Sequence, residues 1–159
     1  MKIDCVINDK IESLEINGTE KLIDILRSKF NLCGSKMRCG EGRCGSCTVL
    51  LDGTPVLSCI LPVYTIQDCS ITTIEYFSIT SEYEDIHKAF YKAGVHHCKY
   101  CEASKYFTIN EFIEQNKMPS KAEIEQFITS MPCKCVEPNT LITGIILAAK
   151  YRRMRTNEK

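Results

Sequence analysis

Cysteines are the residues of this sequence best placed to do chemistry, because a chain of 159 residues contains eleven of them. Eight fall into two groups, and the first group has the spacing C-x4-C-x2-C followed by a distant fourth cysteine. This spacing is typical of plant-type [2Fe–2S] ligation, in which four thiolates hold two irons. The predicted ligands of the first group are Cys39, Cys44, Cys47 and Cys59.

Glycines separate the first three of these cysteines and are predicted to shape the cofactor-binding loop. Without a Cβ, they adopt backbone conformations that other residues resist, so the loop can wrap closely around a compact cluster. Asp52-Gly53, between two apolar runs, predicts a β-hairpin that returns Cys59 toward Cys47. The glycines of the loop are Gly40, Gly42 and Gly45.

The second cysteine group lies in the C-terminal half, where it pairs a C-x2-C motif with a later C-x-C motif. Both motifs fall at junctions of predicted helices, where short loops can direct two thiolates at one centre. Taken alone, four such thiolates suit a structural zinc ion as well as an iron–sulfur cluster. The first group favours the cluster. The predicted ligands here are Cys98, Cys101, Cys133 and Cys135.

Composition narrows the class of protein. Twenty basic and twenty acidic residues leave no net charge, so nucleic-acid or membrane-surface binding has no global electrostatic support. No apolar run is long enough to span a bilayer, and the first residues lack the apolar region of a signal peptide. We therefore expect a cytoplasmic protein that binds neither nucleic acid nor membrane. The odd cysteine count, without an export signal, argues against a disulfide scaffold.

Hydrophobic periodicity predicts an α+β domain over residues 1–76 and a helical domain over residues 85–159, joined by a polar linker at 77–84. Thr19 is the expected N-cap of the first helix, Gly94 a C-terminal stop, and Ser120–Glu123 a capping box. The expected elements are strands at 3–7, 11–16 and 70–75, the hairpin, and helices at 19–30, 86–93, 103–116, 120–131 and 139–155.

Together, these motifs resemble the iron–sulfur subunit, or N-terminal iron–sulfur region, of the xanthine dehydrogenase and aldehyde oxidoreductase family of molybdenum hydroxylases. The resemblance covers nearly the whole chain, and two cluster motifs in this order are highly specific. The matching segments are Leu22–Arg27, Gly34–Lys36, Cys39–Cys47, Ser58-Cys59, Thr72–Glu75, Cys98–Cys101 and Cys133–Cys135.

The resemblance implies a plant-ferredoxin-like β-grasp domain with one [2Fe–2S] cluster, followed by a four-helix domain with a second. It also implies two partners, a molybdopterin-binding large subunit and an FAD-binding subunit. In the family, electrons pass from the molybdopterin through the helical-domain cluster to the ferredoxin-like cluster and on to FAD. The chain would then be the electron-transfer subunit of an oxidoreductase, with no substrate site of its own.

Several residues differ from the family pattern. His97 stands where the family commonly has Gln, Arg38 replaces a usual Gly, and Glu102–Ser104 and Val136–Pro138 replace Thr-Pro-Gly and Thr-Gly-Tyr. In the family the helical-domain segments face the molybdopterin. A divergent pterin-bearing partner or a different electron donor would each account for the changes.

Alternative interpretations remain at this point. The chain could be a free-standing two-cluster carrier, or a one-cluster ferredoxin with a zinc-stabilised interaction module. Lys36, Arg38 and Arg43 either raise the potential of the first cluster or are ordinary solvated charges. His97 could ligate metal in Rieske fashion or contact a partner's cofactor instead. The three leftover cysteines, expected to be buried small hydrophobes, are Cys5, Cys33 and Cys69.

Overall fold

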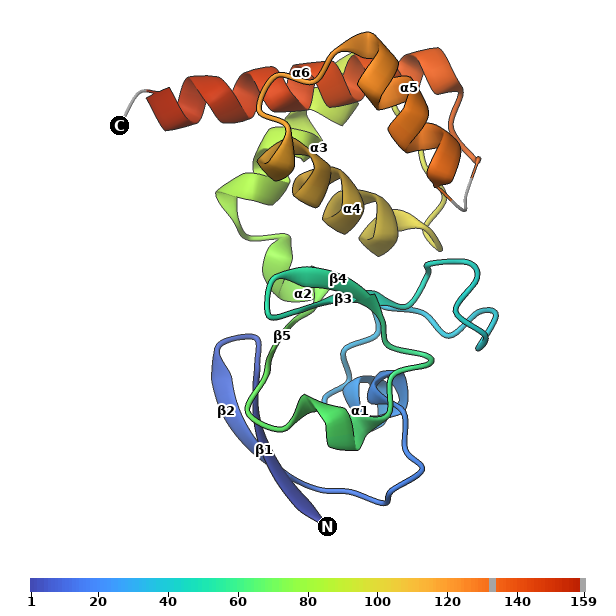
Figure 1. Cartoon of the computed structure of the whole chain (residues 1–159), viewed down its shortest axis with the longest axis vertical. Coiled ribbons are helices and arrows are strands. Elements are labelled where there is room, and N and C mark those ends of the chain that lie inside the picture. The colour runs from blue at the N-terminus through green and yellow to red at the C-terminus, as the bar shows by residue number, and fades with distance from the viewer. Residues whose placement is uncertain (132–133, 158–159) are drawn as a thin grey trace.

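The structure is a computed structural model that describes residues 1–131 and 134–157. Figure 1 shows a sheet-containing half that carries the N-terminus and a helical half that carries the C-terminus, packed end to end. The predicted fold class is confirmed: a mixed sheet with a helix packed on it is followed by a set of longer helices.

A five-stranded sheet with the order β2-β1-β5-β3-β4 forms the N-terminal half. β1 and β5 are parallel, and the other neighbouring pairs are antiparallel. Helix α1 (Leu22–Ser28) buries its apolar face against this sheet, in a core that also holds strand residues of β1 and β3. The strands are β1 Lys2–Ile7, β2 Lys10–Glu15, β3 Thr48–Leu51, β4 Thr54–Leu57 and β5 Ser70–Thr72.

The predicted hairpin joins β3 to β4. Its two central residues both have positive φ, +48° at Asp52 and +82° at Gly53, as the tight turns of twisted hairpins require. Beyond β4 the chain returns to the start of β3, where the Ser58 amide donates to the Cys47 carbonyl at 3.3 Å. The hairpin therefore brings Cys59 beside Cys47, as the sequence predicts.

The predicted start of the first helix was wrong by two to three residues. Lys21, rather than Thr19, is the N-cap, because Lys21 still bridges to Pro62 in extended conformation. The side chain of Glu20 accepts a hydrogen bond from the Asn17 amide and holds the preceding turn. Tertiary pairing with the segment before the 3-10 helix Val63–Ile66 thus delays the helix.

The last strand is also shorter than predicted. It ends at Thr72, because the Thr73 amide donates to the Asn8 side chain at 2.9 Å instead of extending the sheet. A short helix, α2 (Ile74–Phe77), follows at once and buries Ile74 and Phe77.

Four longer helices form the C-terminal half and confirm the predicted caps. Gly94 ends the first with φ +71°, and Ser120 and Glu123 form the capping box of the third. The first helix begins at Ser81, inside the segment predicted as a linker; the predicted domain boundaries themselves stay a prediction. The helices are α3 Ser81–Ala93, α4 Glu102–Gln115, α5 Lys121–Ser130 and α6 Pro138–Asn157.

The two halves share packing where α4 contacts the β3–β4 hairpin. Leu50 of β3 and Phe77 of α2 belong to the same buried cluster as the helical core. Because close packing leaves little freedom for such buried side chains, this contact fixes the hairpin relative to α4. Within the described ranges, no helix has the length and apolar character to cross a membrane.

A buried ion-pair network ties the end of α6 to α3. Asp85, 7% exposed, accepts from Arg152 Nε at 2.6 Å and from Arg155 Nη2 at 2.9 Å. Arg152 also donates to the Glu82 carbonyl and the Asn110 side chain. The network therefore links α6 to α3 and α4 within the helical half.

Removing the shared carboxylate tests this network. Asp85→Ala removes the buried carboxylate that Arg152 and Arg155 share and should lower the free energy of unfolding by about 3 kcal/mol. Urea denaturation followed by circular dichroism measures the loss. The control is Glu84→Ala on the same helix, whose exposed pair with Lys88 should contribute less than about 1 kcal/mol. Equal losses in the two variants would contradict the assigned role.

Candidate metal centres

The loop that carries the first cysteine group depends on left-handed backbone conformations. Gly40, Gly42 and Gly45 have φ of +69°, +74° and +73°. A Cβ at Gly42 would also lie 2.9 Å from the Cδ1 atom of Ile60, although this is the movable end of an exposed side chain. The glycines thus allow the tight turns between the cysteines, for the reason that the sequence suggests.

The four thiols of this group form two pairs. Cys39 interacts with Cys44 in the glycine-rich loop, and Cys47 interacts with Cys59 at the base of the hairpin. The second pair is buried, with 2% and 1% exposure, and packs against Ile23 of α1. Two pairs of thiols, two for each iron, are what a thiolate-ligated [2Fe–2S] cluster needs.

Backbone amides favour the thiolate form at the exposed end of this site. The Glu41 and Arg43 amides donate to Cys39 Sγ at 3.5 and 3.3 Å. The hydrogen bond from the Glu41 amide contributes most to lowering the pKa of the Cys39 thiol to about 6. Backbone hydrogen bonds from Cys44 and Arg43 lower this pKa further. Burial instead raises the pKa of Cys47 to about 11. The site therefore combines amide donors to the Cys39 sulfur at its exposed end with the buried pair Cys47 and Cys59 at its inner end. This combination fits an iron–sulfur cluster.

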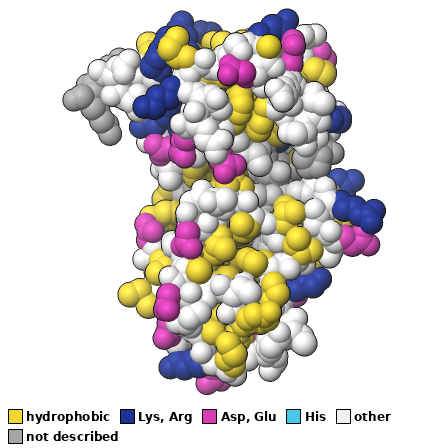
Figure 2. Space-filling view, in the orientation of Figure 1, with side chains coloured by type: hydrophobic (Ala, Val, Ile, Leu, Met, Phe, Trp, Pro, Cys, Tyr) yellow, Lys and Arg dark blue, Asp and Glu magenta, His cyan; other side chains and the backbone are white. Residues whose placement is uncertain are grey.

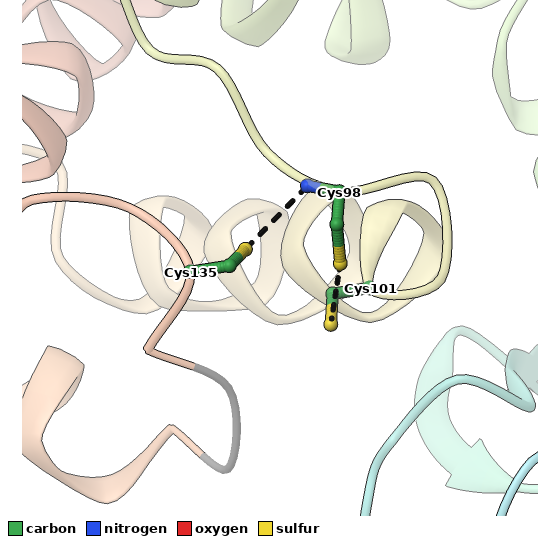
Figure 3. Close-up of side chains that lie close together, drawn as sticks. All are labelled: Cys98, Cys101 and Cys135. Carbon is green, nitrogen blue, oxygen red and sulfur yellow. Dashed lines mark hydrogen bonds between the residues drawn. The ribbon is translucent and has the colours of Figure 1, made fainter.

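The second group gathers more closely (Figure 3). Cys98 Sγ lies 3.3 Å from Cys101 Sγ, and the Cys98 amide donates to Cys135 Sγ at 3.5 Å. The three sulfur atoms all lie within 4.8 Å of one another. Cys98 and Cys101 come from the turn before α4, and Cys135 from the loop before α6. The fourth predicted ligand, Cys133, lies outside the described residues.

The position of Cys101 suits a metal-binding thiolate. It is buried and is the N-cap of α4, where the positive end of the helix dipole stabilises negative charge. The hydrogen bond between the Cys98 and Cys101 sulfur atoms lowers the pKa of the Cys98 thiol to about 7. A thiolate set of this kind fits an iron–sulfur cluster, and it also suits zinc.

One contact joins the two cysteine loops directly. The guanidinium of Arg38, next to Cys39, lies 5.7 Å from the ring centroid of Tyr100, next to Cys101. Figure 1 shows the two loops on the same flank of the molecule. This cation–π geometry involves a residue that departs from the family pattern, Arg38, and places the two sites beside each other.

The other charges near the first group are solvent-exposed. Arg43 pairs with Glu41 at 3.2 Å, with side chains 82% and 62% exposed. Figure 2 shows basic side chains grouped with an acidic one at the edge where this loop lies. Lys36 donates to the Gly34 carbonyl. Screening by solvent and the Glu41 partner favour the interpretation of Arg43 as a solvated loop charge.

His97 turns away from the cysteines into the helical core. Its ring packs edge-on against Tyr106 and Phe90, with centroid distances of 5.6 and 6.0 Å. Burial lowers its pKa, and Nδ1 has no hydrogen-bond partner among the described residues. In the part of the chain that the structure describes, the potential metal-ligand atoms that lie within 4.8 Å of one another are the sulfurs of Cys98, Cys101 and Cys135, and His97 is not part of this group. This packing favours a structural role over Rieske-like ligation.

The leftover cysteines differ in burial. Cys5 is 3% exposed in the sheet core, and burial raises its pKa to about 11, as expected for a small hydrophobe. Cys69 is partly buried, and Cys33 is exposed, so the expectation of burial was wrong for Cys33. Cys33 precedes the loop that the first ligands occupy.

Lys105 is a residue near the second group that the sequence analysis missed. It lies on α4 and is 1% exposed. The available signal was its position four residues after Cys101, which places both residues on one face of α4, with Tyr106 and Phe107 next in sequence.

The glycine loop can be tested without touching a cysteine. Gly42→Ala forces an alanine to φ near +74°, at a cost of roughly 1–2 kcal/mol, and should make the first cluster more labile. Loss of that cluster's EPR signal on mild heating measures the effect. Gly18→Ala is the control, because a Cβ there meets nothing within 4 Å. Equal lability in both variants would contradict the argument.

Comparison with known proteins assigns each half to a family. Residues 5–64 match the model of the 2Fe-2S iron-sulfur cluster binding domain, and residues 73–146 match that of the [2Fe-2S] binding domain. Each match contains one of the two cysteine groups. The two domain families therefore decide between zinc and a cluster at the second site.

Relatives match over most of the chain. A probable xanthine dehydrogenase subunit of Bacillus subtilis is 34% identical over 117 residues, 74% of this chain and 67% of the relative. The nicotine 6-hydroxylase small subunit of Paenarthrobacter nicotinovorans is 29% identical, over 92% of this chain and 88% of the relative. The crystal structure of quinoline 2-oxidoreductase from Pseudomonas putida 86 superposes with a TM-score of 0.82 and 31% identity, over 96% of both chains.

These matches agree with the geometry of two thiolate sites in two adjoining domains. They extend over both halves in the same order, so they concern the whole arrangement and not a single motif. The chain belongs to the iron–sulfur subunits of the xanthine dehydrogenase and aldehyde oxidoreductase family, the molybdenum hydroxylases, and is an electron-transfer subunit with two [2Fe–2S]-binding domains.

Proposed function

We propose that this chain relays electrons between a molybdopterin-bearing subunit and an FAD-bearing subunit of a cytoplasmic oxidoreductase. In this proposal each domain holds its cluster through four thiolates, and the helical-domain site faces the molybdopterin subunit. The ligands are Cys39, Cys44, Cys47 and Cys59 in the first domain, and Cys98, Cys101, Cys133 and Cys135 in the second.

The observation that carries the proposal is the placement of two thiolate sites on facing loops of one packed unit. The contact of Arg38 with Tyr100 joins those loops, and α4 packs on the hairpin that returns Cys59. A bound [2Fe–2S] cluster supplies one-electron chemistry without proton transfer. A chain that holds two such groups side by side can accept an electron at one loop and deliver it at the other.

The residues of the chain have distinct tasks in this relay. Thiolates hold the iron, and the Glu41 and Arg43 amides stabilise negative charge on the Cys39 sulfur. Apolar packing around Cys47 and Cys59 excludes water from the inner side of the first site. The N-terminus of α4 performs the corresponding electrostatic task for Cys101.

Metal analysis and EPR spectroscopy test the two-cluster content. Anaerobically prepared protein should contain two irons and two inorganic sulfides for each of two clusters, and reduction should give two distinguishable signals. Cys44→Ser and Cys135→Ser form a matched pair, because each should remove a different signal. A single signal in the unsubstituted protein, with stoichiometric zinc, would contradict the proposal and favour a zinc-stabilised helical module.

Co-purification tests the proposed partners. Affinity isolation of the full chain from its native cell should recover a large pterin-containing subunit and a flavin-containing subunit, identified by their bound cofactors. A chain that carries both clusters yet elutes alone would instead be a free-standing electron carrier. Glu102 and Val136 depart from the family pattern and lie next to the predicted ligands Cys101 and Cys135 in sequence. The experiment therefore distinguishes a chain with a pterin-bearing partner from a free-standing carrier.

A further inference from the structure

Lys105 carries a cation into the interior of the helical half. It is 1% exposed, although lysine is among the residues least often fully buried in proteins. Placing an ammonium in an apolar environment is costly unless negative charge or polar groups compensate it. Lys105 therefore places a positive charge inside the helical half, out of contact with solvent.

The helix geometry directs Lys105 toward the second cysteine group. Its amide donates to the Cys101 carbonyl at 3.0 Å, so the two residues lie one turn apart on the same face of α4. Side chains on a helix lean toward its N-terminus, and a long side chain covers the preceding turn. The Lys105 side chain therefore starts from the face of α4 that carries Cys101.

Burial also limits what Lys105 can do. It is already inaccessible in the isolated chain, so it cannot serve as a contact for a partner subunit or for that subunit's cofactor. Its charge acts inside this domain, where a low effective dielectric weakens screening. This separates Lys105 from the exposed Arg43 at the first site.

We propose that Lys105 is a buried counter-charge that raises the reduction potential of the helical-domain cluster. A [2Fe–2S] cluster with four thiolates is an anion, and one-electron reduction makes it more negative. A fixed cation nearby stabilises the reduced form more than the oxidised form. In this role Lys105 is not a ligand of the cluster and acts only through its charge. The inference depends on the cluster assignment proposed above.

Redox titration of the full chain, monitored by EPR, tests the proposal. Lys105→Met removes the charge while keeping a long apolar side chain, and should shift the midpoint of the helical-domain signal to a more negative potential. Lys105→Arg should stay near the unsubstituted value. The ferredoxin-like signal should stay unchanged in both variants, and Cys135→Ser identifies which signal is which.

Lys99→Met is the matched control for exposure. Lys99 lies between Cys98 and Cys101 in sequence but is exposed, so its removal should shift the same signal less than removal of Lys105. The Lys105→Met shift should also persist at high salt. A shift as large in Lys99→Met, or one abolished by salt, would overturn the assignment to a buried charge.

The remaining outcomes are distinguishable. Two signals with an unchanged helical-domain potential in Lys105→Met would overturn this proposal and leave the two-cluster function intact. Absence of two signals from the unsubstituted protein would instead refute the function. If Lys105→Met loses the helical-domain cluster, Lys105→Gln takes its place in the titration, because it keeps a polar side chain without the charge. An unchanged potential in Lys105→Gln, or loss of the cluster from Lys105→Gln and Lys105→Arg alike, would overturn the proposal.

Discussion

The packing of α4 against the β3–β4 hairpin is the contact on which the function of this chain depends. Cys101 caps α4, and Cys47 and Cys59 flank the hairpin, so the same contact positions both metal sites. Leu50 carries the packing across the boundary into the helical core. Rigid elements hold site residues more accurately than loops do, and here they fix the separation of two sites that otherwise lie on loops.

Both sites compensate the negative charge of their thiolates, but they use different groups to do so. Each site gathers thiolates, and each supplies positive partial charge to compensate them. The first uses loop amides, which glycines with positive φ make available around Cys39. The second uses the N-terminus of α4 and the buried cation of Lys105. A solvent-exposed loop and a packed helix end therefore provide unequal environments for two chemically similar clusters.

Much of the fold was predictable because its signals are local. The Asp52-Gly53 turn, the Ser120–Glu123 capping box and the Gly94 helix end depend on residues a few positions apart, and all three are confirmed. The errors lie where distant residues compete with local preference. The Asn8 side chain accepts a hydrogen bond from the Thr73 amide, so β5 ends there. A β-bridge to Pro62 keeps Lys21 in extended conformation, so α1 begins after it. A sequence pattern carries no record of such partners.

The sequence by itself determined the chemistry of this protein. Cysteine spacing and the intervening glycines specify thiolate loops, because most ligands of such a cluster lie close together in sequence. Only the tertiary structure decided how those loops combine. It placed Arg38 over Tyr100, packed His97 in the helical core and buried Lys105 one helical turn after Cys101. These outcomes depend on packing between segments far apart in sequence, where burial, and not residue type, sets the environment of each charge.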